Sequence, residues 1–117
     1  MLIGELARTA GTTVRALRYY EQNGLLPARR SANGYRDYPA TAVTRVRNIR
    51  RLLGLGLTAT EIRHFRPCLD DEYDETRSCP ESVSLIARKL AATEARLAEM
   101  STTRELLARE LRRAAAH

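Results

Sequence analysis

Apolar residues recur every three or four positions in several short stretches of the N-terminal half, and glycine-containing breaks separate these stretches. Such spacing places the apolar side chains on one face of a helix. The pattern predicts short helices over 3–8 and from 14 to about 22, a longer helix from 40 to about 53, and a fourth from 58 to near 67. Two short helices joined by a tight turn at Gly11 form the outline of a helix-turn-helix.

A polar run at 29–38 separates the second and third predicted helices. It contains Asn33-Gly34, a pair that accepts the positive φ angles of a tight hairpin turn. The run carries three arginines besides Tyr35 and Tyr38, and it is too polar to form a core element. We therefore expect a small β-hairpin that projects from the helices as a wing.

The C-terminal part has a different pattern, since the chain contains neither Gly nor a further Pro between Pro80 and Ala116. Apolar residues follow a heptad repeat there, which predicts a long coiled-coil helix. At about 1.5 Å per residue this helix is roughly 50 Å long, too long for so small a domain to cover. Packing back along the domain would cover only part of the stripe, so we expect pairing with a second copy. The expected dimer interface consists of Val83, Ile86, Leu90, Leu97, Met100, Leu107 and Leu111.

Charge is distributed unevenly along the 117 residues, which carry a formal net charge of +6. Residues 1–67 hold twelve arginines and four acids, residues 68–80 are net acidic, and residues 81–117 are nearly balanced. Of the twenty basic residues only Lys89 is a lysine. Arginine binds phosphate and guanine edges with a planar fork, so the basic half favours a nucleic-acid partner over a merely solvated surface. We expect three segments: a winged-helix DNA-binding domain at 1–67, an acidic linker at 68–79 and a dimerisation helix at 80–117.

Several classes of protein are excluded at this stage. No apolar run is long enough to span a membrane, and the N-terminus lacks the pattern of a signal peptide. Two cysteines are too few for the disulfide framework of a small secreted domain, so we expect a cytoplasmic protein. The chain has no phosphate-binding loop, nucleophile elbow or paired-histidine zinc motif. We therefore expect neither an enzyme nor a cofactor.

Four strings of the N-terminal half follow one another in a characteristic order: IGELA at 3–7, TVRALRYYEQNGLLP at 13–27, NGYRDY at 33–38 and GLGLT at 54–58. Together they resemble the MerR family of bacterial transcription regulators. The resemblance implies a mainly α fold, with a winged helix-turn-helix and an antiparallel coiled-coil homodimer. It also implies binding to a palindromic operator in the spacer of a double-stranded promoter. Distortion of that spacer would bring both promoter elements into reach of RNA polymerase.

Chemistry and resemblance together assign the DNA contacts. The first turn of the second helix would face base edges, while wing residues and one arginine of the third helix would hold the backbone. The residues assigned to this role are Thr13, Val14, Arg15, Arg18, Tyr19, Tyr20, Arg36, Tyr38 and Arg45. For Arg18 an internal salt bridge is the alternative, and one of the two adjacent tyrosines is expected to pack inward.

Other functions remain open alongside this one. An excisionase-like architectural protein uses a similar winged helix without recruiting polymerase, although it usually lacks a long dimer helix. A protein-interaction module would use only the coiled coil. Cys68 and Cys79 bracket the acidic linker, and they are packing residues, a reversible disulfide or, with His64, part of a metal site. The effector, the operator and the sign of regulation are left open.

Overall fold

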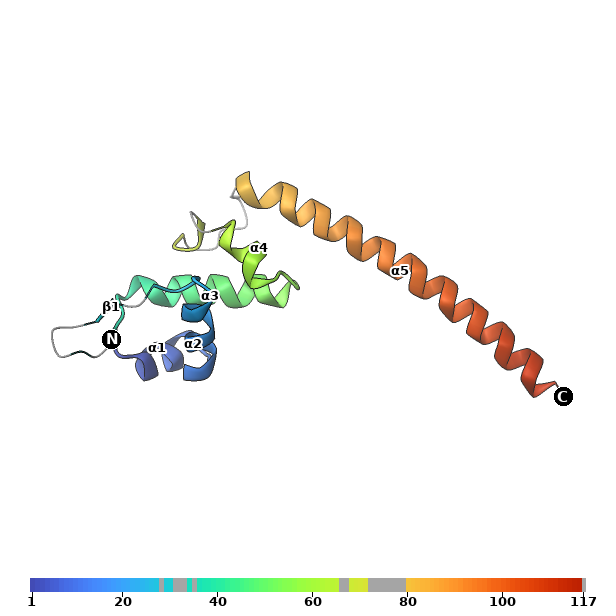
Figure 1. Cartoon of the computed structure of the whole chain (residues 1–117), viewed down its shortest axis with the longest axis horizontal. Helices are drawn as coiled ribbons and strands as arrows, with labels where there is room; N and C mark the ends of the chain where they lie inside the picture. The colour runs from blue at the N-terminus through green and yellow to red at the C-terminus, as the bar shows by residue number, and fades with distance from the viewer. Residues whose placement is uncertain (28, 31–33, 35, 66–67, 72–79, 117) are drawn as a thin grey trace. The chain divides into compact units, whose positions relative to one another are not determined.

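Helices form most of the structure, as the apolar periodicity predicted (Figure 1). The computed structural model describes residues 1–27, 29–30, 34, 36–65, 68–71 and 80–116. It divides into two compact units, Met1–Val83 and Ser84–His117, which are described separately below.

The helix-turn-helix comprises α1 (Ile3–Ala10) and α2 (Val14–Gln22). Helix α1 runs two residues beyond the predicted stretch and ends at Gly11, whose φ of 72° lets its amide bond back to the carbonyls of the last turn. Glycine adopts this left-handed conformation without steric cost. The predicted start of the second helix is confirmed, because the Thr13 hydroxyl accepts a hydrogen bond from the Ala16 amide at 3.1 Å.

Helices α3 (Thr41–Gly54) and α4 (Ala59–Arg63) follow. The predicted capping box opens α4: the Thr58 hydroxyl accepts from the Glu61 amide, and the Glu61 carboxylate accepts from the Thr58 amide. Helix α4 is shorter than predicted. Its last residues bond to carbonyls only three positions back, which tightens the chain into turns and ends the helix after Arg63.

Two short strands, β1 (Arg29–Arg30) and β2 (Arg36–Asp37), pair antiparallel between α2 and α3. Arg29 lies opposite Asp37, and Arg30 lies opposite Arg36. Directly after β2, the Tyr38 amide donates a hydrogen bond of 2.8 Å to the Met1 carbonyl.

The core of the first unit is mostly aliphatic, with Tyr20, Tyr38 and Phe65 as its aromatic members. Helix α3 packs against both α1 and α4 and supplies its centre. The largest fully buried side chains are Tyr38, Leu6, Leu17, Leu25, Ile49, Ile62, Leu69 and Val46. Burial of this apolar surface holds α1 and α2 in a fixed relation to α3.

The second unit consists of helix α5 from Ser84 onward. Helix α5 spans Pro80–Ala115, and its 36 residues correspond to a length of about 54 Å at 1.5 Å per residue. None of the helices in the described part of the chain is long and apolar enough to cross a membrane.

Candidate DNA interface

One face of α2 is polar and open to solvent, whereas the opposite face is buried. Leu17 and Tyr20 face the core, while Arg15, Arg18 and Tyr19 are exposed. Neither of the two guanidiniums has a hydrogen-bond or ion-pair partner within the part of the chain that the structure describes. The internal salt bridge considered for Arg18 is therefore not present there, and both side chains are available to an external anion.

The adjacent tyrosines have different environments. Tyr20 is 5% exposed and belongs to the core, whereas Tyr19 is 49% exposed. Their rings meet edge to face, with centroids 6.2 Å apart. This contact holds the exposed ring of Tyr19 against a buried neighbour, so of the pair only Tyr19 presents its hydroxyl to solvent.

Two arginines of α3 hold the turn of the helix-turn-helix. Arg47 Nη2 donates to the Thr9 carbonyl at 3.2 Å, and Arg50 Nη1 donates to the Ala10 carbonyl at 3.0 Å. The last carbonyls of a helix have no partner within it, so these bonds satisfy the C-terminal end of α1. A Cβ on Gly11 would lie 3.2 Å from Arg50 Nη1, which is a second reason for glycine at this turn.

The far end of α2 is held in the same way. Arg63 of α4 donates through Nη1 to the Asn23 carbonyl at 2.8 Å. Sequence reasoning missed all three of these arginine–carbonyl bonds. The one sequence feature that could have indicated them is the spacing of Arg47 and Arg50, which places both on the same side of α3.

Arg45 lies elsewhere than expected for a phosphate contact. It is 8% exposed, and its Nε donates to the Leu25 carbonyl at 2.6 Å. Its Nη1 lies 3.2 Å from both carboxylate oxygens of Asp70. Because the guanidinium is buried and already paired, it connects the end of α2 to the chain beyond α4 instead of facing DNA.

Asn48 lies near Arg45 on α3 and binds the same segment. Its Nδ2 donates to the Leu69 carbonyl at 2.8 Å and to the Asp71 carbonyl at 2.7 Å. We call Arg45 and Asn48, with residues 69–71, the linker anchor. It attaches the beginning of the predicted acidic linker to the central helix of the first unit.

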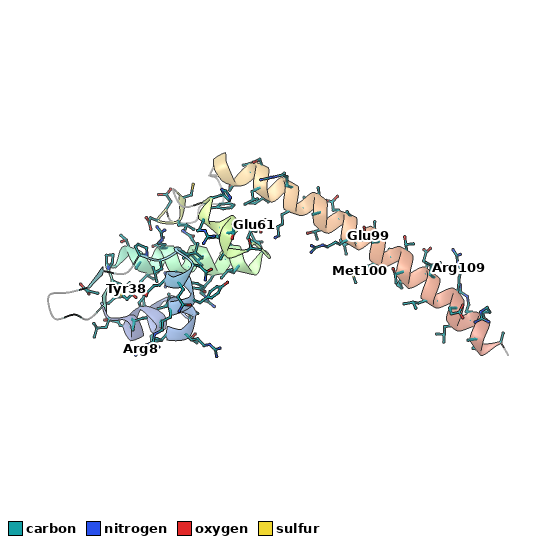
Figure 2. All side chains as sticks on the ribbon, in the orientation of Figure 1. Arg8, Tyr38, Glu61, Glu99, Met100 and Arg109 are labelled. Atoms are coloured by element: carbon teal, nitrogen blue, oxygen red, sulfur yellow. The ribbon has the colours of Figure 1, made fainter. Side chains whose placement is uncertain are left out.

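Tyr38 also differs from the expectation of a backbone contact. It is 1% exposed, and its hydroxyl donates to the Glu21 carboxylate (Figure 2 labels Tyr38). A side chain so placed fixes the base of the strand pair against α2. Arg36 occupies β2, but its side chain lies outside the described residues, so its expected DNA contact stays a prediction.

The cysteine that the structure describes is half-buried. Cys68 is disulfide-bonded, and Cys79 lies outside the described residues. Among the described residues no three His, Cys, Asp or Glu side chains are grouped so as to hold a metal ion.

All seven residues of the expected dimer interface are exposed on the isolated helix α5, with exposed fractions from 39% to 70%. Figure 2 shows Met100 projecting from the helix. An exposed apolar stripe of this length is typical of a protein–protein interaction surface, and its pairing with a second copy stays a prediction.

Comparison with known proteins gives the same picture. Residues 1–67 match the family model described as MerR HTH family regulatory protein, and residues 43–109 match the model described as MerR, DNA binding. The transcriptional regulator HmrR of Rhizobium leguminosarum is 33% identical over 107 residues, which cover 92% of this chain and 81% of HmrR. The regulator ZntR of Escherichia coli is 32% identical over 108 residues, covering 92% and 75% of the two chains.

Two solved structures share the fold. PbrR691 of Ralstonia metallidurans, solved in complex with lead(II), superposes with a TM-score of 0.73 at 31% identity, covering 92% of this chain and 82% of that one. HiNmlR, a regulator lacking the sensor domain and solved on promoter DNA, gives 0.56 at 24% identity, covering 94% and 86%. Because the second match is only 24% identical, it supports the fold alone.

Proposed function

Since this chain belongs to the MerR family and is a DNA-binding transcription regulator that acts as a homodimer, we propose that the exposed face of α2 reads its operator and that the dimer distorts the promoter. The observation that carries this proposal is the pair of exposed arginines, Arg15 and Arg18, on the solvent face of α2, which have no partner among the described residues. Exposed guanidiniums keep their donors available to an external anion, and phosphate oxygens and guanine edges accept such donors.

The positions of the other residues support two separate roles, contact with DNA and positioning of the contacting groups. Thr13 and Val14 begin α2, where a recognition helix usually meets base edges. Tyr19 offers a hydroxyl to phosphate from the same face. We propose that Arg36 on β2 contacts the flanking backbone as part of a wing, while Tyr38, Tyr20 and Arg45 position these groups from inside the unit.

Two copies of the unit explain how the protein would change transcription. A symmetric dimer places two α2 helices on the two halves of a palindrome. Bending or untwisting the promoter spacer costs on the order of several kcal/mol. The favourable free energy of the backbone contacts of both units must offset this cost. We propose that this distortion, not a direct contact with polymerase, controls the promoter.

The test is binding to DNA from the promoter upstream of the chain's own gene, followed by fluorescence anisotropy at several salt concentrations. Arg18→Ala should weaken binding by about tenfold and lower the slope of affinity against salt by about one, as expected for one lost phosphate contact. Arg109→Ala removes an equally exposed arginine from α5 and serves as the matched control. Equal binding by both variants would contradict the proposed interface.

A second assay distinguishes a transcription regulator from an architectural DNA-binding protein. In transcription reactions with purified RNA polymerase, shortening the promoter spacer should make output independent of the protein, because the distortion is then no longer needed. An excisionase-like protein would bind the same DNA without changing polymerase output on either spacer.

The disulfide of Cys68 favours thiol sensing as a second candidate function. The structure of PbrR691 with lead(II) makes a metal ion the competing effector. Promoter output would be measured for the wild type, Cys68→Ser and Cys79→Ser, with oxidant, with lead(II) and with neither. A response to oxidant that both variants lose supports thiol sensing. Unchanged regulation in both variants would show that the cysteines serve packing only.

A further inference from the structure

The C-terminal end of α2 is held by contacts that reach the chain beyond α4. The Leu25 amide donates to the Tyr20 carbonyl at 2.9 Å, so Leu25 belongs to the turn that closes α2. The Leu25 carbonyl accepts from Arg45 Nε at 2.6 Å, and Arg45 Nη1 lies 3.2 Å from both carboxylate oxygens of Asp70. A continuous series of contacts therefore joins Asp70 to α2 through one buried guanidinium.

We propose that Asp70 is a positioning residue for DNA binding. Through Arg45 it holds α2 in the orientation that meets the operator, so that docking of residues 69–71 onto α3 and binding of operator DNA favour each other. The inference rests on the proposed function and adds a further part of the chain to it. The DNA-binding unit then extends to residue 71, beyond the boundary at residue 67 that the sequence predicted.

The charge of Arg45 makes its hold on Leu25 depend on Asp70. The Arg45 side chain is buried, and a buried guanidinium is costly unless a carboxylate pairs with it. If residues 69–71 leave α3, Nη1 loses its one ion-pair partner among the described residues, and rotation toward water becomes favourable. Such a rotation takes Nε away from the Leu25 carbonyl, and the turn after α2 loses its buried donor.

Docking of residues 69–71 and pairing of Asp70 are separate contributions. Asn48 Nδ2 donates to the Leu69 and Asp71 carbonyls, and Leu69 is buried, so these contacts hold the segment on α3. The Asp70 carboxylate is 61% exposed, and an ion pair at the surface contributes little to stability by itself. Asp70 therefore affects the conformation of Arg45 more than the stability of the fold, and the two effects can be measured separately.

A change at the end of α2 reaches the proposed DNA face through the adjacent tyrosines. The Tyr20 carbonyl accepts from the Leu25 amide, and the Tyr20 ring meets the exposed ring of Tyr19 edge to face. Arg18 precedes this pair on the same helix of nine residues. So short a helix moves as one body, and displacement of its C-terminal end shifts Arg18 and Tyr19 relative to DNA.

Neutralisation of Asp70 tests the proposal in the full chain. Asp70→Asn should weaken binding to promoter DNA about fivefold in the anisotropy assay, because Arg45 loses its carboxylate. Asp70→Glu keeps a carboxylate at an exposed position and should bind within about twofold of the wild type. Thermal denaturation checks that both variants are folded at the temperature of the assay. A folded Asp70→Asn protein that binds DNA like the wild type would overturn the proposal.

Asp71→Asn is the matched control, because it removes the same charge one position away. The Asp71 carboxylate has no hydrogen-bond or ion-pair partner in the described part of the chain. Loss of a negative charge by itself favours binding to a polyanion, so Asp71→Asn should bind DNA at least as tightly as the wild type. Equal weakening by Asp70→Asn and Asp71→Asn would show an effect that does not pass through Arg45, and it would overturn the proposal.

Hydrogen exchange of the Asn48 side chain, followed by NMR, provides a readout that a purely structural role would not change. Coupling between two sites is reciprocal, so operator DNA must favour docking of residues 69–71 if docking favours operator binding. The Asn48 Nδ2 protons exchange with solvent when their bonds to the docked segment open. Operator DNA should slow this exchange about fivefold more than exchange of the Ile62 amide in α4. Equal slowing at both positions would show only a general stabilisation and would contradict the coupling.

Arg18→Ala is measured in the same titrations, which separates this inference from the proposed function. If Arg18→Ala binds promoter DNA like the wild type, the proposed DNA interface on α2 is wrong and both proposals fail. If Arg18→Ala binds weakly while Asp70→Asn binds like the wild type, the interface stands and only the positioning role of Asp70 is overturned.

Discussion

The arginines of the first unit fall into two groups according to what their guanidiniums contact. Arg47, Arg50 and Arg45 bind backbone carbonyls, and through them α3 holds the ends of α1 and α2. Arg15 and Arg18 have no such partner in the segments that the structure describes. The basic charge that suggested a nucleic-acid partner is therefore partly structural, and only some of it is available for DNA.

Arg45→Ala should lower the free energy of unfolding by about 2–3 kcal/mol, because the Leu25 carbonyl loses its buried donor and Asp70 loses its cation. Urea denaturation measures this change. Arg47→Ala, which removes a more exposed bond to a carbonyl, should cost less than about 1 kcal/mol. Unchanged stability of Arg45→Ala together with lost operator affinity would restore Arg45 as a DNA contact.

Sequence reasoning could not distinguish these arginines because burial depends on distant partners. Asp70 lies 25 positions from Arg45, and the Leu25 carbonyl is a backbone group that no side-chain pattern reveals. The assignment of Tyr38 failed for the same reason, since its acceptor Glu21 is far away in sequence. The exposed arginines of α2 were predictable because they share a short helix with Leu17, whose burial fixes the opposite face.

At the level of elements, local signals were sufficient for most helix starts. Thr13 and Thr58 cap α2 and α4 as predicted, because a capping hydroxyl needs only an amide three residues ahead. The end of α4 was less predictable. It is determined by tight turns at residues 64–65, whereas the stop signal in the sequence, Pro67, comes two residues later.

The two caps provide a matched pair of variants. Thr13→Ala and Thr58→Ala should each lower stability by about 1 kcal/mol, since each leaves a helix amide without its acceptor. Only Thr13→Ala should also weaken operator binding severalfold in the anisotropy assay, because of the two capped helices only α2 belongs to the proposed DNA interface. Equal operator affinity of the two variants would mean that Thr13 acts as a cap and nothing more.

At the level of the whole molecule, the proposed function assigns assembly to one long helix and DNA binding to a separate unit. The heptad pattern predicted the stripe on α5 in full because every residue of the expected dimer interface lies on one helix, so no tertiary contact was needed to find it. The attachment of residues 69–71 to α3 through the linker anchor depends on tertiary contacts, and no sequence pattern indicated it.

Leu97→Glu should convert the dimer into a monomer at micromolar concentration, because it places a charge at the middle of the expected dimer interface. Leu97 is 61% exposed in the single chain, so the first unit should keep its thermal transition. Operator affinity should fall at least tenfold, since the two half-sites are no longer bound together. Ala98→Glu adds the same charge on the neighbouring, outward position and should leave the dimer intact in sedimentation. A dimeric Leu97→Glu protein would exclude the apolar stripe of α5 as the interface.

The position of the single lysine limits how the cell can modify this regulator. Acylation neutralises lysine but leaves arginine unchanged. The unit proposed to bind DNA contains no lysine at all, and Lys89 lies on α5, the helix proposed to hold the dimer together. Lysine acetylation would therefore leave the charge of the α2 face intact and act instead on how firmly two copies hold each other.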